Sequence, residues 1–161
     1  MKKIIKIIII FFSNFFVFVL KKSNFGRYVL DEISRSNNRR KKSVVYNNIK
    51  LKFYIPNRLS YYRVNTFNTK EPETLNWIDK FEKRTIFWDV GANIGGLTTV
   101  MSRMVGPRGV VCAFEMSPRS INKCQTNIIQ NGCSNVQLFH KAVYHSSFEK
   151  MPIFLGDHDA A

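Results

Sequence analysis

The sequence predicts an α/β fold with a doubly wound parallel sheet, because strand-like and helix-like segments alternate along its second half. Three short apolar runs have the length of strands: residues 85–90, 110–114 and 136–139. Two longer segments between them, residues 97–105 and 117–131, have helical character. Strands that alternate with helices pair in parallel and are joined by right-handed crossovers.

Turn residues mark the ends of these elements. The tetrapeptide Gly106-Pro107-Arg108-Gly109 separates the first helix from the second strand, and Asn131-Gly132 ends the second helix. Residues 151–155 are a candidate for a fourth strand.

Two further elements are expected ahead of this alternation. Residues 50–55 alternate polar and apolar side chains, which is typical of a half-buried strand, and a turn follows at residues 56–58. Residues 71–78 begin a helix, because Pro72 suits its first turn and the acidic residues there complement the helix dipole.

Length and charge suggest one folded domain with a basic leading part. A chain of 161 residues has room for about one domain. The net charge of +14 is uneven: residues 1–84 carry +13 and residues 85–161 carry +1. We expect an apolar segment at residues 1–22, a basic linker with a lead-in strand at 23–59, and the α/β domain at 60–161.

The apolar segment between residues 4 and 20 is 17 residues long, at the lower limit for a membrane-spanning helix. Three interpretations stay open: an uncleaved membrane anchor, an interfacial or core-packing helix, and a cleaved signal. No small-residue cleavage site follows, which favours the anchor over the signal. Lysines flank the segment on both sides, so charge does not fix its orientation.

The segment at residues 34–43 contains no apolar side chain and is expected to be a flexible basic linker. The alternative is a phosphate-binding patch beside a membrane. We favour the linker.

Neither the cysteines nor the histidines indicate a metal site. Cys112, Cys124 and Cys133 have spacings that match neither a metal motif nor a disulfide framework, so free thiols are expected. His140 and His145 are expected at strand ends. The three consecutive residues at 157–159 (D-H-D) cannot all face one ion, so a polar loop is expected there.

The strongest chemical signal is the segment D-V-G-A-N-I-G-G at residues 89–96, between a strand and a helix. Ligands of parallel sheets bind at such turns, beyond the carboxyl ends of the strands. Gly91 and Gly95 allow a tight turn and close approach to a ligand, and Asn93 tolerates a left-handed conformation. Asp89 would orient the loop or receive an amino group of the ligand.

Glu115 ends the second strand, 24 residues after Gly91. An acidic residue at about this distance from a glycine loop hydrogen-bonds ribose hydroxyls, and its charge would repel a 2′-phosphate. The ordered combination of strand, glycine loop, helix, strand and acid predicts a nucleoside cofactor.

The glycine spacing differs from the G-x-G-x-x-G of dinucleotide folds. The sequence instead resembles the FkbM-type family of S-adenosylmethionine-dependent methyltransferases. The matching motifs are E-P-E-T-L-N-W-I (71–78), F-W-D-V-G-A-N-I-G-G (87–96), V-V-C-A-F-E-M-S-P (110–118), N-I-I-Q-N-G (127–132) and K-A-V (141–143). Together they cover about residues 60–161.

The resemblance implies a Rossmann-like class I sheet and methyl transfer from S-adenosylmethionine to a hydroxyl of a sugar, a lipid-linked glycan or a small metabolite. It places the loop beside the methionine and ribose of the cofactor, Glu115 at the ribose and Met116 near the adenine. Two interpretations stay open for Glu71, Glu73 and Thr74: they cover the cofactor, or they form an exposed helix start. The expected cofactor-binding residues are Asp89, Gly91, Ala92, Asn93, Gly95, Glu115 and Met116.

Members of this family resemble one another in continuing past a fourth strand to a sheet of about seven. The chain ends just after its candidate fourth strand, so we expect a fragment, with the sheet truncated there, and we predict no catalytic residue. One alternative is a non-catalytic cofactor-binding remnant. A nucleic-acid methyltransferase is less favoured, and no nucleic-acid partner is expected. We expect a membrane-associated protein with a cytoplasmic methyltransferase domain, or alternatively a soluble cytoplasmic one.

Overall fold

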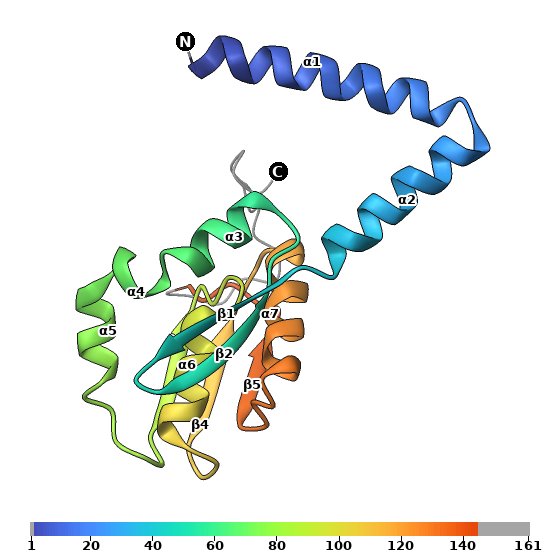
Figure 1. Ribbon diagram of the computed structural model, residues 1–161. Coiled ribbons are helices and arrows are strands. Elements are labelled where there is room, and N and C mark those ends of the chain that lie inside the picture. The colour runs from blue at the N-terminus through green and yellow to red at the C-terminus, as the bar shows by residue number, and fades with distance from the viewer. Residues whose placement is uncertain (1, 145–161) are drawn as a thin grey trace. The chain divides into compact units, whose positions relative to one another are not determined.

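The computed structural model describes residues 2–144 (Figure 1). The chain divides into two compact units, residues 1–40 and residues 41–161. The candidate fourth strand at 151–155, His145 and the D-H-D segment at 157–159 lie outside the described residues.

The first unit consists of helices α1 (Lys2–Lys21) and α2 (Asn24–Asn38). By length and composition, the segment Lys3–Lys21 of α1 could cross a membrane, and none of this segment is buried. Ser23 caps α2, because its side-chain oxygen accepts a hydrogen bond of 2.9 Å from the backbone N–H of Gly26.

The prediction of a flexible linker at residues 34–43 is wrong for most of these residues. Helix α2 continues to Asn38, and strand β1 begins at Lys41. The segment contains neither glycine nor proline, so no strong helix breaker stops the helix that starts at Asn24.

The second unit opens with an antiparallel hairpin of β1 (Lys41–Tyr46) and β2 (Ile49–Tyr54). Asn47 and Asn48 form its two-residue turn with φ of 44° and 62°, the positive values that a type I′ turn requires. Strand β2 confirms the expected strand at 50–55.

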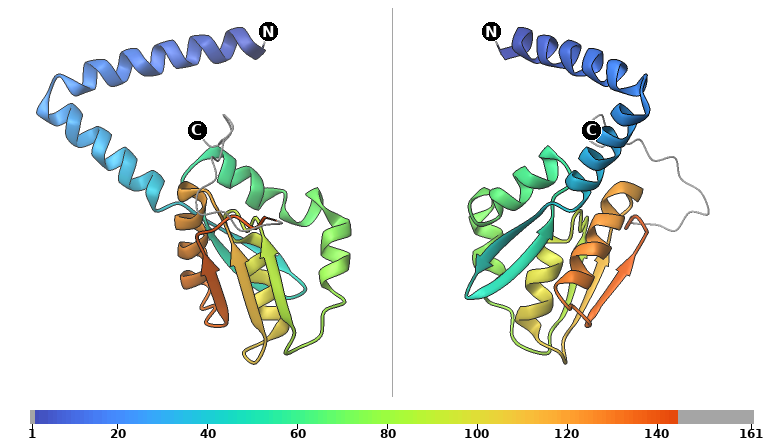
Figure 2. Two further views of the ribbon diagram at one scale, coloured as in Figure 1. Left: turned by 180° about the vertical axis from the view of Figure 1, so that it is seen from behind. Right: turned by 45° about the vertical axis from the view of Figure 1, so that its right-hand side comes forward.

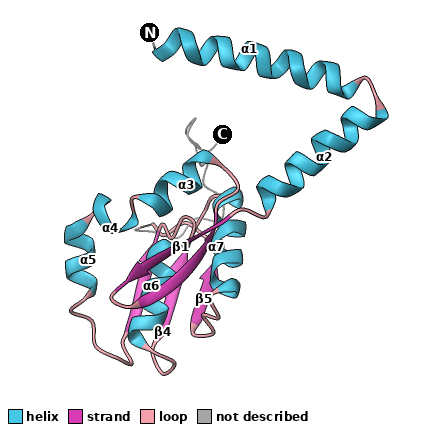
Figure 3. Cartoon of the chain, viewed as in Figure 1, coloured by secondary structure: helices cyan, strands magenta, loops and turns pink. Residues whose placement is uncertain are grey.

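Three short helices follow the hairpin: α3 (Arg58–Asn65), α4 (Phe67–Lys70) and α5 (Pro72–Ile78). Asn57 caps α3 by accepting a hydrogen bond from the backbone N–H of Ser60. Helix α5 confirms the helix predicted at 71–78, with Pro72 in its first turn. Figure 3 shows these helices in cyan beside the strands in magenta.

The central sheet contains β3 (Ile86–Val90), β4 (Val110–Phe114) and β5 (Val136–Phe139), in the order β3-β4-β5 and all parallel. Helix α6 (Gly96–Val105) connects the first two strands, and α7 (Pro118–Gln130) connects the last two. Figure 2 shows the three strands side by side. The α/β class with a parallel, Rossmann-like sheet is thereby confirmed.

The two faces of this sheet differ in burial. One face is packed: Phe87 contacts the aromatic rings of Trp77 and Phe81, and Val111 and Ala113 are fully buried. On the opposite face Ile86, Trp88 and Val90 are 57–66% exposed. A row of rings crosses this face from Trp88 to Phe114, with centroids 5.4 Å apart, and on to Phe139, at 4.9 Å.

Asn127 of α7 and Asn131, the C-cap of this helix, join the helix to the hairpin. The side-chain oxygen of Asn127 accepts a 2.7 Å hydrogen bond from the backbone N–H of Tyr54, and its amide group donates to the carbonyl of Ile94, also at 2.7 Å. One turn later, Asn131 both accepts from the N–H and donates to the carbonyl of Lys52, each at 2.8 Å. The backbone N–H and carbonyl groups along this edge of β2 are thus paired with side chains rather than with another strand.

Candidate cofactor-binding site

The glycine loop lies at the carboxyl ends of β3 and β4, as predicted. The backbone N–H groups of Gly91 and Ala92 both donate to the carbonyl oxygen of Phe114, each at 2.9 Å. The loop is therefore fixed to the end of β4, and these two N–H groups are already used within the protein.

Three loop residues adopt positive φ: Gly91 (83°), Asn93 (54°) and Gly95 (78°). The two glycines serve different purposes. A Cβ on Gly91 would have no atom within 4 Å, so this glycine borders open space, whereas a Cβ on Gly95 would lie 2.9 Å from the sulfur of Cys124. Gly91 leaves its backbone open to the adjoining space, and Gly95 allows close packing of the loop against α7.

Asp89 stabilises the start of α6. Its carboxylate accepts a 2.5 Å hydrogen bond from the Thr98 hydroxyl and is 7% exposed. Burial raises the pKa of Asp89, hydrogen bonds from the Thr98 hydroxyl and backbone N–H lower it, and the charge of Glu115 raises it further, with a net increase. This geometry suits the loop-orienting role, and a direct cofactor contact stays a prediction.

Glu115 is held by two backbone groups. One carboxylate oxygen accepts the N–H of Asn93 and the other accepts the N–H of Ser117, both at 2.7 Å. A carboxylate oxygen can accept more than one hydrogen bond, so each retains capacity for a ligand hydroxyl. The side chain is buried and needs no rearrangement to present these acceptors.

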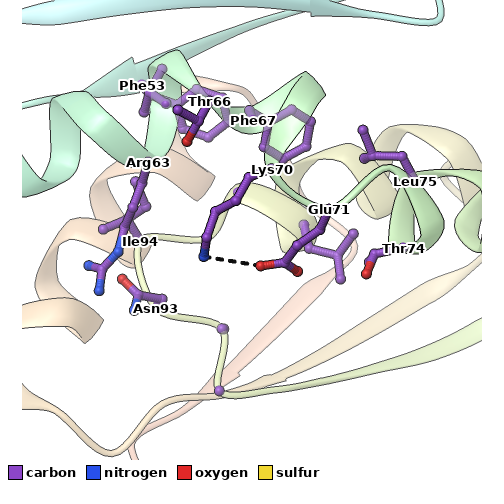
Figure 4. A pocket seen from close by; sticks show the side chains of 15 residues that line it. Phe53, Arg63, Thr66, Phe67, Lys70, Glu71, Thr74, Leu75, Asn93 and Ile94 are labelled. Atoms are coloured by element: carbon purple, nitrogen blue, oxygen red, sulfur yellow. Dashed lines mark ion pairs between the residues drawn. The ribbon is translucent and has the colours of Figure 1, made fainter.

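A first cavity of about 290 Å³ lies on one side of the loop. Its wall combines Gly91, Ala92 and Asn93 of the loop with polar side chains from the three short helices and the residues between them (Arg63, Lys70, Glu71 and Thr74). Figure 4 shows Arg63, Lys70, Glu71 and Asn93 directed into this space. Lys70 and Glu71 form an ion pair of 3.1 Å.

A second cavity of about 430 Å³ lies over the end of β4. Glu115, Met116 and Ser117 line it together with Lys141 and Ala142, which follow β5. Gly91, Asn93 and Arg63 line both cavities. The glycine loop is therefore the shared wall of two hollows that can hold different parts of one ligand.

The predicted residues divide between these spaces. Ala92 lines the first cavity and Glu115 and Met116 line the second, whereas Asp89 and Gly95 line neither. Of the three residues at the helix start, Glu71 and Thr74 line the first cavity and Glu73 does not. The sequence did not indicate Arg63 or Lys70, because they belong to α3 and α4, which carry no clear helical pattern.

Asn93 has a feature that its backbone role does not explain. Its side-chain oxygen is buried and accepts no hydrogen bond from the described residues. Buried acceptors are nearly always satisfied, so this oxygen suits a donor on a bound ligand.

Two other titratable side chains near the loop are His140 and Cys124. Nε2 of His140 donates to the carbonyl of Met116 at 3.0 Å. Burial, with the charges of Asp89 and Glu115, raises the pKa of Cys124 to about 12 despite a Thr98 hydrogen bond. Among residues 2–144, the structure contains no group of three His, Cys, Asp or Glu side chains that could hold a metal ion.

Comparison with solved structures finds methyltransferases at low identity. A protein-L-isoaspartate O-methyltransferase is 18% identical over 80% of this chain (TM-score 0.39), and a SAM-dependent O-methyltransferase from Thermotoga maritima is 18% identical over 62% (TM-score 0.42). Aeropyrum pernix fibrillarin, solved with natively bound S-adenosyl-L-methionine, is 14% identical over 65% (TM-score 0.41). The chain covers 40–42% of the length of each. No curated protein matches it.

The family comparison is more extensive. Residues 22–147, most of the chain, match the model of the protein-L-isoaspartate(D-aspartate) O-methyltransferase (PCMT) family. The narrower resemblance to the FkbM type stays a prediction. The chain belongs to the PCMT family, a family of class I methyltransferases whose cofactor is S-adenosylmethionine.

Proposed function

We propose that this protein binds S-adenosylmethionine across the glycine loop and acts as an O-methyltransferase. The observation that carries the proposal is the pair of cavities that share Gly91 and Asn93 as a wall. The cofactor has two chemically different ends, a nucleoside and an amino acid, and we assign one end to each cavity.

The second cavity suits the nucleoside. The Glu115 carboxylate has acceptor capacity for ribose hydroxyls, as an acidic residue at the end of the second strand does in nucleotide-binding folds. Met116 offers an apolar, polarisable surface for the adenine ring, and Lys141 and Ala142 border the same space.

The first cavity suits the amino-acid end. Glu71 can pair with the α-ammonium group, and Lys70 or Arg63 can pair with the α-carboxylate. The unsatisfied side-chain oxygen of Asn93 adds an acceptor for the ammonium. Opposite charges within one cavity match a zwitterion better than they match a ligand of single charge.

When bound, S-adenosylmethionine supplies an electrophilic methyl group on a sulfonium. The contribution of the protein is to hold the acceptor oxygen in line with that methyl group. We propose a hydroxyl acceptor on a sugar, a lipid-linked glycan or a small metabolite, which is the acceptor class that the FkbM-like motifs imply. Such an acceptor must lose a proton, and a general base would assist.

The family match favours a second candidate, a carboxylate acceptor of the isoaspartyl type. A carboxylate is already ionised at neutral pH and needs no base. Whichever of Arg63 and Lys70 does not pair with the cofactor carboxylate would attract the negative charge of the acceptor. The two products are chemically distinct, since a methyl ester is hydrolysed by mild alkali and a methyl ether is not. Methyl transfer from labelled cofactor to an isoaspartyl peptide and to a glycan, followed by alkali treatment, separates the two candidates.

Calorimetric titration of the full chain tests the binding proposal. We expect S-adenosylmethionine to bind and NAD not to compete, because the loop lacks the dinucleotide spacing. The reverse result would refute the proposal. Binding without methyl transfer to either acceptor class would favour a cofactor-binding protein that does not turn over.

The orientation of the cofactor has its own test. 5′-Methylthioadenosine keeps the nucleoside and lacks the amino-acid end. We expect Lys70→Gln and Glu71→Gln to weaken binding of S-adenosylmethionine more than binding of methylthioadenosine, and Glu115→Gln to weaken both. Lys80→Gln, at an exposed site outside both cavities, is the control. Equal losses for both ligands in the Lys70 and Glu71 variants would contradict the orientation.

We also propose that α1 anchors the protein in a membrane. The helix is long enough for a bilayer, its apolar side chains are largely exposed, and basic residues flank it. Carbonate extraction of membranes from cells that express the full chain tests this: an integral anchor stays with the membrane, and a soluble protein is released.

A further inference from the structure

The close approach of α2 to the end of α1 requires a glycine in the first turn of α2. A Cβ on Gly26 would lie 2.1 Å from the carbonyl oxygen and 2.7 Å from the Cα of Leu20. Both are backbone atoms, so no side chain can be added at this position unless the turn opens. The Ser23 cap on the N–H of Gly26 fixes the same corner from the other side. The first unit is therefore two helices joined at a close, defined corner.

Helix α2 has one apolar side that nothing in its own unit covers. Phe25, Tyr28 and Ile33 are 76%, 65% and 49% exposed. Phe25, Val29 and Ile33 follow the four-residue spacing of one helix side, with Tyr28 and Glu32 at its edge. Arg27, Asp31 and Arg35 follow the same spacing on the opposite side. Apolar and charged sides of this kind are typical of helices that lie in a membrane interface.

Charge indicates which surface this helix fits. Residues 21–40 contain six basic side chains (Lys21, Lys22, Arg27, Arg35, Arg39 and Arg40) against two acidic ones (Asp31 and Glu32). A second copy of the chain would bring like charges together. An anionic lipid surface complements both the charge and the apolar side.

We infer that α2 lies along the headgroups of an anionic bilayer, with Phe25, Val29 and Ile33 toward the acyl chains and the basic side chains toward lipid phosphates. Gly26 sets the corner between this surface helix and α1. The inference rests on the proposal that α1 enters the bilayer. The span Lys3–Lys21 has 19 residues, which gives a helix of roughly 28 Å, close to the hydrocarbon thickness of about 30 Å.

Hydrogen exchange of the full chain, followed by mass spectrometry of its peptides, provides the test. With vesicles of phosphatidylcholine alone, we expect slowed exchange in α1 only. With phosphatidylserine added, we expect severalfold slower exchange in α2 as well, and loss of this extra protection in high salt. Protection of α1 without any lipid-dependent change in α2 would overturn the inference and leave the anchor standing. No protection of either helix would overturn both.

The Gly26→Ala variant tests the corner by an effect of unexpected sign. Alanine has a higher helix propensity than glycine, so propensity alone predicts slower exchange in α2 of this variant. The corner predicts the opposite on anionic vesicles, because the added Cβ collides with Leu20 and forces α2 off the surface. Ser34→Ala, at an exposed position farther along α2, is the matched control for propensity.

Two outcomes would contradict the proposed role of Gly26 or the proposed lipid partner of α2. If Gly26→Ala protects α2 as Ser34→Ala does, the corner has no role in placing the helix. If α2 becomes protected without vesicles as protein concentration rises, its apolar side is covered by a second copy rather than by lipid.

Discussion

The carboxylate of Glu115 is hydrogen-bonded to the backbone N–H of Asn93 at 2.7 Å. This contact joins the end of β4 to the glycine loop that follows β3, so the acceptor expected for ribose also holds the loop in its left-handed conformation at Asn93. The proposed cofactor binding and the geometry of the loop therefore depend on the same side chain.

Replacement of Glu115 by glutamine should lower both stability and cofactor affinity. Glutamine has one acceptor oxygen, so either the N–H of Asn93 or that of Ser117 would face an amide donor. An unsatisfied buried group costs about 1–3 kcal/mol. Urea denaturation measures the stability loss, and calorimetry measures the affinity. Glu82→Gln, at an exposed site, should change neither; equal effects of the two variants would show that the Glu115 contacts are not important.

Alanine at Gly91 and at Gly95 should have different consequences. Both positions have positive φ, which costs an L-residue roughly 1–2 kcal/mol. At Gly95 the new Cβ also meets Cys124, whereas at Gly91 it enters open space beside the cavities. We expect Gly95→Ala to lower the thermal unfolding temperature more, and Gly91→Ala to lose more cofactor affinity than its stability loss explains. The opposite ranking would contradict the assigned roles.

Loss of the Asn127 side chain should destabilise the second unit. Alanine there would leave the N–H of Tyr54 and the carbonyl of Ile94 without their partners. The expected cost is about 1–3 kcal/mol for each group that water cannot reach. Asn122→Ala, on the exposed side of α7, is the control. Equal urea midpoints for the two variants would show that the hairpin does not depend on this contact.

The raised pKa of Asp89 predicts a pH dependence of stability. A carboxyl group whose pKa is higher in the folded state favours folding while it is protonated, and this contribution is lost as pH rises through the folded pKa. Relative to Asp89→Asn, the wild-type chain should therefore lose stability as the pH rises above the ordinary carboxyl pKa of 3.8 and through the raised folded pKa. Urea denaturation of both proteins at several pH values checks this. A difference that grows in favour of the wild type with rising pH would contradict it.

The sequence predicted the central sheet well because its elements are locally determined. Strands β3, β4 and β5 are short apolar runs, and glycines limit the helices between them. Strand β1 was missed because it begins K-K-S, a polar start that is typical of a linker. The Asn47–Asn48 turn, which joins β1 to its partner β2, was not recognised in the sequence.

The site was predictable where it is continuous in sequence and not where the fold assembles it. The loop and Glu115 follow strand ends, so their meeting could be inferred from topology. Arg63 enters the cavity from α3, 28 residues before Gly91, and only the tertiary packing of three short helices brings it there. The roles of Asn127 and Asn131 were hidden for the same reason, since each bonds to a strand more than 70 residues away.

The hydrogen bonds between α7 and β2 also have a consequence for protein synthesis. The hairpin leaves the ribosome long before its partners: Tyr54 and Asn127 are 73 residues apart, and Lys52 and Asn131 are 79 apart. At roughly 5–20 residues per second, β2 waits roughly 4–16 s with an unpaired edge before α7 exists. During that interval, the nascent chain exposes a strand edge to other proteins, and chaperone binding to residues 41–54 is expected to end when α7 emerges.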